Sequence, residues 1–467
     1  MREGCLGALF SYAVSRSRKM ISRLCLQDFR NYSGLDIHFS EGPVVFYGAN
    51  GMGKTNILEA ISLFTAGNGL RNGKIQDFFR SQNAETMAPP QPKQLEQCGV
   101  GIKIEPDFFE EDSRKKADVS LTTYMEVSAN NALRRVCKIQ GKTVKNAACF
   151  YDYLNIVSIT PTVDLLFIEP AKTRRDFIDS LISSYNSAHS LHLHNYEKAA
   201  RQRLAILKKM RVSDEEWLSS LEETMAQSGT AIAEARSNFV HLLDEGQLMC
   251  AASSTKFTSK IVGEAEGLPP EALMQKLKLT REKDSICGFT SFGCHRSDWV
   301  ATHVSNNRKV RDCSTGEQKI TLISVILSFI HRRMHPASGS TEWRGVEAQA
   351  QGGPVQADPR LAPGKIADSV GTRPDDPANF RWLGEHKNDK LLVLLLDDVV
   401  ARLDHKHRNV LFDQLLEIER NVKGSNDGGS LQVFFSGIER ESFADLNNAQ
   451  FFEVADLGRS VTREVAK

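Results

Sequence analysis

The sequence lacks a strong net charge, and this lack excludes a protein that is basic over its whole surface. Its 467 residues include 59 lysines and arginines and 58 aspartates and glutamates, so the net charge is only +1. Any surface that binds a nucleic-acid backbone must therefore be a local basic patch. With 41% hydrophobic and 25% charged residues, the composition is that of a globular protein with two or three domains.

Paired cysteines and long apolar runs are also missing. None of the nine cysteines forms a C-x-x-C pair, which argues against structural zinc or a disulfide framework and favours a reducing compartment. The longest apolar run, LLVLLL at 391–396, is far shorter than the roughly 18 residues that cross a bilayer. We therefore expect a cytoplasmic protein without a membrane partner. Residues 1–19 carry basic residues around a short apolar patch, and either a targeting peptide or an upstream start codon fits them.

A glycine-rich loop is the most specific feature that the sequence does contain. YGANGMGKTN at 47–56 fits G-x-x-x-x-G-K-[ST] without deviation, between a short apolar run and a segment with helical spacing. In such a loop the backbone N–H groups and the helix N-terminus face phosphates. Lys54 would reach the β- and γ-phosphates, and Thr55 would offer its hydroxyl to Mg²⁺. We therefore expect ATP and Mg²⁺ as cofactors, held by Gly48, Ala49, Asn50, Gly51, Met52, Gly53, Lys54 and Thr55.

The second candidate is the acidic end of a buried strand, LLVLLLDD at 391–398. Ligands bind at the carboxyl edge of a parallel sheet, so carboxylates placed there face a nucleotide. Asp397 is expected to hold Mg²⁺, and Asp398 to polarise the attacking water together with Lys54 as the catalytic pair. An ordinary acidic strand end is the alternative for this motif taken alone.

CSTGEQKITLISVIL at 313–327 predicts a second helix N-terminus, opened by a short Ser/Gly turn. Its N–H groups and the Ser314 hydroxyl could hold an anion, or they could form an ordinary helix cap. One ATP does not need two such termini from one subunit. If this one binds phosphate, the nucleotide belongs to a second molecule.

These motifs follow one another in the order seen in ABC-type ATPases, and the chain resembles the RecF family of SMC-like ATPases. STGEQ resembles a signature motif, and ARLD at 401–404 resembles the loop after the acidic strand. MISRLCLQDFRNY (20–32), TPTVDLLFIEPAKTRRDFID (160–179) and TSFGCHRSDW (290–299) are similar to further family elements. The departures are Cys294, where the family usually has proline, and Ser297, where it usually has aspartate. VFFSGIER (433–440) has no switch histidine, so Ser436 is the only polar candidate there, and the sensor of the γ-phosphate stays unassigned.

The resemblance implies a function as well as a fold. The expected fold is an α/β ABC-type ATPase head, with a mixed sheet, an antiparallel side lobe and an inserted short helical arm. Members of this family are understood to dimerise when ATP is bound, to bind double- and single-stranded DNA at gaps, and to help load RecA with RecO and RecR. Ser314, Gly316 and Asp404 would then contact the nucleotide held by the partner subunit. Hydrolysis would be weak, stimulated by DNA, and would release the dimer.

Domain boundaries follow from changes in the hydrophobic pattern along the chain. We expect an extension (1–19), an ATPase head in three parts (20–190, 281–335 and 390–467), a helical arm (191–280) and a disordered insertion (336–389). The insertion holds six of the fifteen prolines and almost no apolar periodicity. Residues 81–98 are expected to form a surface loop.

Two other functions remain open from the sequence, and both would ignore DNA. One is the ATP-binding subunit of an ABC transporter, which the missing switch histidine and the helical arm disfavour. The other is a small-molecule kinase, which STGEQ disfavours. The candidate DNA contacts are basic residues of the side lobe and the arm, each of which could equally be a solvated or paired structural charge. They are Lys142, Lys145, Arg174, Arg175, Arg201, Arg203, Lys208 and Lys209.

Overall fold

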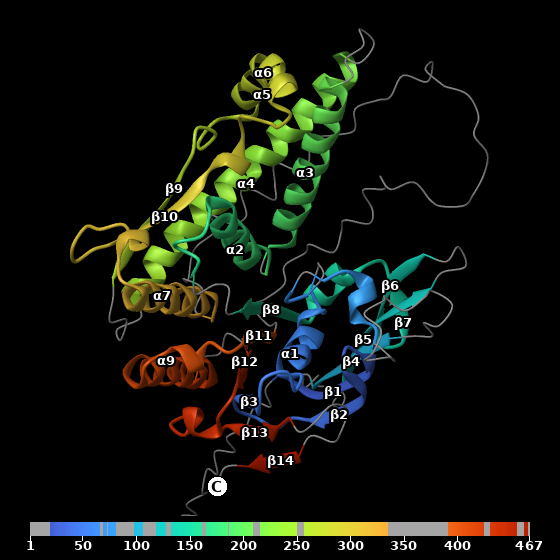
Figure 1. Ribbon diagram of the computed structural model, residues 1–467, viewed down its shortest axis with the longest axis vertical. Coiled ribbons are helices and arrows are strands. Elements are labelled where there is room, and N and C mark those ends of the chain that lie inside the picture. Colours follow the sequence, from blue (N-terminus) through green and yellow to red (C-terminus); the bar gives the residue numbers. More distant parts are fainter. Residues whose placement is uncertain are drawn as a thin grey trace, which may run out of the picture.

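A computed structural model of the chain consists of a head built on two six-stranded sheets and an arm built on two long helices (Figure 1). Residues 1–18, 81–97 and 335–390 lie outside the described part, so the expected extension, most of the 81–98 loop and the expected insertion are not tested. The described residues are 19–65, 69–71, 73–80, 98–105, 118–127, 132–160, 165–184, 186–208, 215–249, 256–334, 391–424, 430–454 and 462–465.

The first sheet is mixed and holds both expected motifs. Its strand order is β14-β13-β3-β12-β11-β8, and within it only the edge strand β14 is antiparallel to its neighbour. Its strands are β3 (Val44–Tyr47), β8 (Leu154–Ile159), β11 (Leu391–Leu396), β12 (Ser430–Gly437), β13 (Gln450–Glu453) and β14 (Thr462–Val465). β3 lies between β12 and β13, and β8 pairs with β11, so strands from the N-terminal and C-terminal parts of the chain are neighbours in this sheet. The head is therefore closed by pairing across the whole sequence.

The second sheet is antiparallel, in the order β2-β1-β4-β5-β6-β7. Its alternating apolar and polar residues bury one face, as the sequence pattern indicated. Its strands are β1 (Met20–Phe29), β2 (Tyr32–His38), β4 (Cys98–Glu105), β5 (Val119–Val127), β6 (Leu133–Ile139) and β7 (Lys142–Val144). Together with the mixed sheet and the arm, it confirms the expected fold class of an ABC-type ATPase head.

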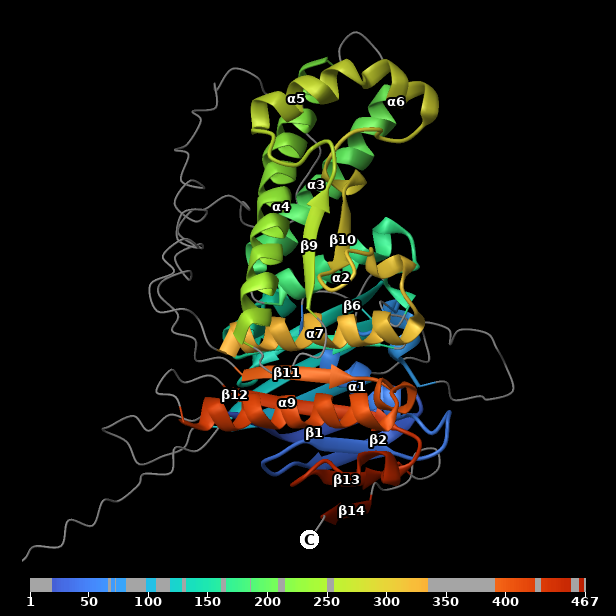
Figure 2. The same ribbon diagram turned by 90° about the vertical axis from the view of Figure 1, so that its left-hand side faces the viewer.

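Both faces of the mixed sheet are covered, which explains why β11 is apolar at every position. Leu391, Val393 and Leu395 belong to a core shared with the antiparallel sheet and α1 (Lys54–Ser62). The alternate residues, Leu392 to Leu396, belong to a core shared with α7 (Thr315–Met334) and α9 (His405–Gly424). Figure 2 shows α7 and α9 lying across β11 and β12 on that side. A strand buried on both faces needs a continuous hydrophobic run.

The arm consists of α3 and α4 with a small cap at its far end (Figures 1 and 2). A two-stranded ribbon of β9 and β10 runs along α4, and α2 lies at the base of the arm. These elements are α2 (Ala171–Ser183), α3 (Ser187–Leu207), α4 (Glu215–Met249), β9 (Phe257–Val262), α5 (Pro270–Leu279), α6 (Arg281–Cys287) and β10 (Asp298–His303). Among the described residues, no helix combines the length and apolarity needed to cross a membrane.

A buried ion pair fastens α4 of the arm to α2 at its base. Arg236 of α4 makes two hydrogen bonds to Asp179 of α2, with Nε–Oδ1 and Nη2–Oδ2 distances of 2.8 and 2.6 Å. Arg236 also donates to the carbonyl of Cys294, and the Ser297 hydroxyl donates to the same oxygen. Both departures from the family pattern therefore lie in this packed joint, away from the glycine loop.

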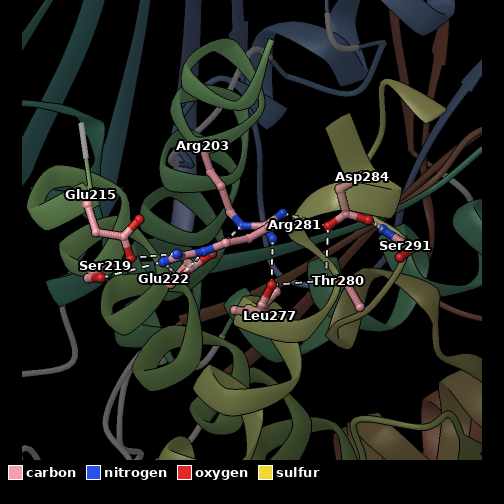
Figure 3. Close-up of polar contacts among 9 residues, drawn as sticks. All are labelled: Arg203, Glu215, Ser219, Glu222, Leu277, Thr280, Arg281, Asp284 and Ser291. Carbon is pink, nitrogen blue, oxygen red and sulfur yellow. Dashed lines mark hydrogen bonds and ion pairs between the residues drawn. The ribbon is translucent and has the colours of Figure 1, made fainter. Parts of the chain in front are cut away.

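A second buried network ties the far end of the arm together (Figure 3). The fully buried Arg203 of α3 donates to Glu222 of α4 at 2.9 Å and to Asp284 of α6 at 2.6 Å. Arg281 completes the network with a 2.6 Å contact to the other oxygen of Glu222. Removing Arg203 would leave the buried Asp284 without its counter-charge, a loss that typically costs several kcal/mol.

This network yields a prediction about local stability. Arg203→Met should lower the opening free energy of α3 and α4 by about 3–5 kcal/mol. Arg201→Met is the matched control, because Arg201 lies two residues away and makes only an exposed 3.5 Å pair with Glu197. The control should change stability by no more than about 0.5 kcal/mol. Amide hydrogen exchange of peptides from α3 and α4 measures both effects. Equal protection of the α3 and α4 amides in the two variants would contradict the conclusion that the buried Arg203 network stabilises the arm.

Candidate nucleotide site

The glycine loop adopts backbone conformations that only glycine accepts readily. Gly48, Gly51 and Gly53 have φ values of 142°, 84° and 104°. The loop connects β3 to α1, and Gly53 is the N-cap of that helix. A Cβ on Gly53 would lie 2.4 Å from the side chain of Asn31 and 2.7 Å from the hydroxyl of Tyr32. Ala49, Asn50 and Gly51 are exposed, and Met52 is half-buried.

Lys54 lies across the loop. Its ammonium donates to the carbonyls of Gly48 and Ala49 at 2.7 and 2.8 Å, and the residue is only 7% exposed. Burial lowers the pKa of Lys54, while Asp398 and Asp397 oppose that shift by favouring the charged form. The ammonium is thus held at the mouth of the loop by carbonyls that a phosphate group could replace as acceptors.

Thr55 and Asp397 meet although they lie at opposite ends of the chain. The Thr55 hydroxyl donates to Oδ1 of Asp397 at 2.9 Å, and Asp397 is buried at the end of β11. One hydroxyl and one carboxylate oxygen are hard ligands suited to Mg²⁺. The described residues contain no cluster of three or more His, Cys, Asp or Glu that could hold a metal alone. That donor set fits Mg²⁺ bound together with phosphates, since Mg²⁺ commonly takes only one or two protein ligands.

Ser436 links the two aspartates, a role that the sequence did not reveal. Its hydroxyl donates to Oδ1 of Asp397 at 2.7 Å and accepts the backbone N–H of Asp398 at 2.9 Å. Asp398 has φ 54°, a left-handed conformation that is uncommon outside glycine and that surrounding contacts must maintain. Ser436 therefore fixes both the Asp397 carboxylate and the turn that presents Asp398.

The remaining candidates stand at the N-termini of two other helices. Ser314 and Gly316 are exposed at the start of α7. Ser314 forms a capping box with Glu317, through contacts of 2.8 Å from its hydroxyl and from its backbone N–H to the carboxylate. Asp404 caps α9 by accepting the His407 N–H at 2.9 Å, and this hydrogen bond holds the pKa of Asp404 below its usual value. The structure thus brings Lys54, Thr55, Asp397 and Asp398 together, and it places Ser314 and Gly316 at the start of α7 and Asp404 at the start of α9.

Two of the candidate DNA contacts are buried structural charges, the alternative that the sequence left open. Arg203 is fully buried in the arm network. Arg174 is 6% exposed and makes two hydrogen bonds to Asp298, at 2.8 and 2.9 Å. Arg175 is partly buried and donates to the Ser297 carbonyl. Lys209 lies outside the described residues. The exposed candidates are Lys142, Lys145, Arg201 and Lys208.

The sequence did not reveal the contacts between the turn after β1 and α1, the helix that follows the glycine loop and is called the P-loop helix below. Arg30 makes a two-pronged ion pair with Glu59 of α1, with distances of 2.9 and 2.7 Å, and Glu59 is fully buried. Asn31 donates to the Met52 carbonyl at 3.2 Å and accepts from Asn56 at 2.7 Å. The available signal was Glu59 itself, a charge among the apolar positions of a helix. Such a charge needs a buried partner.

The Ser436 contacts give a prediction about nucleotide turnover. Ser436→Ala removes a hydrogen bond to a carboxylate and one that supports a strained residue, so turnover should fall about tenfold or more. Ser430→Ala, at the other end of the same strand, is the control and should leave turnover near the wild-type rate. The steady-state rate of ATP hydrolysis, measured for each variant after its melting temperature has been shown to match the wild type, checks this prediction. Wild-type turnover in Ser436→Ala would show that the hydroxyl does not organise the aspartates.

Comparison with known proteins finds relatives along almost the whole chain. Residues 20–338 match the family model described as "RecF/RecN/SMC N terminal domain". The chain is 30% identical over 447 residues to a protein from Mesorhizobium japonicum named DNA replication and repair protein RecF, covering 93% of this chain and 96% of the relative. A protein of the same name from Rhizobium rhizogenes is 30% identical over 449 residues, covering 94% of this chain and 97% of the relative.

The fold is also found among solved structures. A structure described as "the recombination mediator protein RecF-ATP in RecFOR pathway" superposes with a TM-score of 0.66 and 20% identity, covering 97% of this chain and 100% of that one. This similarity supports the head-and-arm fold. The family model matches most of the chain, and the relatives are 30% identical to it, so the similarity extends to the sequence as well as the fold. The chain belongs to the RecF family of SMC-like ATPases.

Proposed function

We propose that the chain is an ATP-dependent DNA-binding protein of recombinational repair and replication-fork maintenance, in which ATP joins two copies. The observation that carries this proposal is the contact between Thr55 of the glycine loop and Asp397 of the acidic strand. With Lys54 beside them, these groups form a site for the phosphates of a nucleoside triphosphate and its Mg²⁺. The relatives named DNA replication and repair protein RecF support the biological role.

Each residue of the site has a distinct task in this proposal. When bound, Mg²⁺·ATP supplies the anhydride bond that water cleaves. The backbone N–H groups of 49–53 and the N-terminus of α1 would receive the phosphates, and the Lys54 ammonium would donate to phosphate oxygens in place of the Gly48 and Ala49 carbonyls. Thr55 and Asp397 would hold the metal ion. Asp398 would accept a hydrogen bond from the attacking water and act as its base.

The second half of each site comes from the other copy. Ser314 and Gly316 are exposed at the start of α7, where helix N–H groups and a hydroxyl can approach an anion from outside the subunit. A Cβ on Gly316 would meet no atom within 4 Å in its own chain, so this surface has room for a partner. The exposed Asp404 would border the same interface. ATP then acts as the contact between subunits, and slow hydrolysis, stimulated by DNA, releases the dimer.

DNA binding is assigned to the exposed basic residues. The exposed candidates are Lys142 and Lys145 on the side lobe and Arg201 and Lys208 on the arm, whereas Arg203 and Arg174 are buried, Arg175 is partly buried and Lys209 lies outside the described residues. We propose that the ATP-bound dimer binds double- and single-stranded DNA at gaps in the cytoplasm and helps RecO and RecR to load RecA. The solved relative assigned to the RecFOR pathway supports this choice of partners.

The domain boundaries stay part of this proposal. The ATPase head would comprise 20–190, 281–335 and 390–467, with the arm at 191–280, although α6 (Arg281–Cys287) packs with the far end of the arm through the Arg203–Asp284 ion pair. The transporter and kinase alternatives are disfavoured, because the similarity to RecF proteins extends over 93% of the chain, including the arm.

Mixed dimers test the composite site. Ser314→Arg should leave the ATP affinity of the monomer near normal but block ATP-dependent dimerisation and hydrolysis. Lys54→Met should abolish ATP binding by removing the ammonium aimed at the phosphates. In a mixture of the two, one composite site carries both changes and the other carries neither. ATPase activity should therefore recover in part when the two inactive variants are combined.

The mixing experiment has two outcomes that overturn the composite site. Ser314→Arg that loses ATP binding as a monomer would show that STGEQ belongs to its own subunit's site or only caps α7. Ser314→Arg that dimerises and hydrolyses ATP normally would remove the second subunit from the mechanism. Gly34→Ala is a suitable control, because a Cβ there meets no atom within 4 Å.

Salt dependence tests the DNA surface. The double variant Lys142→Gln/Lys145→Gln should reduce the slope of log K against log salt concentration by about two, since each phosphate contact contributes about one. Arg134→Gln is the control, because Arg134 is already paired with Glu126. Fluorescence anisotropy with gapped DNA between low and moderate salt measures the slopes. An unchanged slope in the double variant would exclude these lysines from the DNA surface.

A further inference from the structure

Strand β6 of the antiparallel sheet carries arginines on both of its faces. Arg134 and Lys138 point to the outer face, where Arg134 pairs with Glu126 and the Lys138 ammonium lies 4.9 Å from the centre of the Tyr124 ring. Arg135, between them, points to the opposite face, because successive residues of a strand alternate. That face belongs to the core shared with the P-loop helix, to which Leu121 and Met125 of β5 contribute.

The Arg135 guanidinium reaches the end of the P-loop helix. Its Nε donates to the hydroxyl of the fully buried Thr123 at 2.9 Å, and its Nη2 donates to the carbonyl of Leu63. Leu63 is the C-cap of α1. Burial of the guanidinium lowers the pKa of Arg135.

The end of α1 depends on such contacts because the helix is short. Its nine residues span only about 13 Å, so few internal hydrogen bonds hold its axis. The carbonyls of its last turn need partners from elsewhere. The Ser62 hydroxyl donates to the Glu59 carbonyl at 2.6 Å, and the Thr65 hydroxyl donates to the Ser62 carbonyl at 2.9 Å. The Arg135 guanidinium donates to the Leu63 carbonyl, and its positive charge also complements the negative end of the helix dipole.

The opposite end of the same helix holds the phosphate-binding residues. Lys54 and Thr55 form its first turn, so a tilt at Leu63 changes where their side chains point. Phosphate sites lose affinity when such groups move by a fraction of an ångström. The turn after β1 already holds the helix, through Asn31 at Asn56 near its N-terminus and through Arg30 at Glu59, its sixth residue. Arg135 adds a contact at the carboxyl end, on the C-cap residue Leu63.

We propose that Arg135 is a positioning residue for nucleotide binding, which it promotes by fixing the carboxyl end of the P-loop helix from strand β6 of the antiparallel sheet. This inference rests on the proposed function, since it assumes that the loop binds ATP. Arg135 acts through α1 and touches neither the nucleotide nor the metal.

The test compares Arg135→Gln with Arg134→Gln, a neighbour on the same strand that faces away from α1. Binding of Mg²⁺·ATP is measured by isothermal titration calorimetry, well below the melting temperature of each variant. Arg135→Gln should raise the dissociation constant about three- to tenfold, and Arg134→Gln should not change it. Turnover at saturating ATP should change by less than about twofold, because Asp397, Asp398 and Ser436 lie on other strands.

Conservative variants separate positioning from general loss of stability. Arg135→Lys should restore most of the affinity, because an ammonium can still donate to a carbonyl at a helix end. Thr123→Val removes only the hydroxyl that orients the guanidinium. It should raise the dissociation constant in the same direction, which keeps the test valid if Arg135→Gln fails to fold. ATP affinities of Arg135→Gln and Thr123→Val equal to wild type, with only lower melting temperatures, would overturn the inference.

Titration of Lys54→Met with Mg²⁺·ATP separates a failure of the proposed function from a failure of the inference about Arg135. Undiminished ATP binding in Lys54→Met would refute the proposed function, and the inference about Arg135 would fall with it. Loss of binding in Lys54→Met with normal binding in Arg135→Gln would refute only the inference. Loss of binding in Lys54→Met, weakened binding in Arg135→Gln and normal binding in Arg134→Gln are the results expected.

Discussion

The hydrogen bond between Thr55 and Asp397 is the contact on which the head depends. It joins residues separated by 342 positions, at a distance of 2.9 Å. For the two to meet, β3 and β11 must enter one sheet with their carboxyl ends at the same edge, and the arm must leave and return between them. The site therefore forms only because the head is assembled from segments that are far apart in the sequence.

The order of the strands explains why Ser436 has its place in the site. β12 pairs with β3 on one side and with β11 on the other, both in parallel. Its carboxyl end therefore lies between the glycine loop and the acidic strand end. A small hydroxyl at that point can hold the Asp397 carboxylate and the Asp398 backbone together. The antiparallel sheet supports the other side of the site, where Arg30, Asn31 and Arg135 hold α1.

Local patterns in the sequence predicted the parts of the site that local chemistry determines. The glycine spacing fixes a loop with positive φ, and a strand buried on both faces gives the run LLVLLL before two aspartates. The sequence could not predict which arginines are buried. Arg203 and Arg201 stand on the same helix, yet the first is enclosed because Asp284, 81 residues away, folds onto it. Nor could it assign Ser436 or Arg135, since each acts through a strand pairing or a helix end that only the tertiary structure defines.

Sedimentation velocity tests the central claim most directly, that ATP joins two copies through a site built from both. The chain is measured without nucleotide, with Mg²⁺·ADP and with Mg²⁺ plus a non-hydrolysable ATP analogue. The account predicts a monomer in the first two conditions and a dimer in the third, with no dimer for Lys54→Met in any condition. A wild-type chain that remains monomeric with the saturating analogue, or that dimerises equally well without nucleotide, would contradict it.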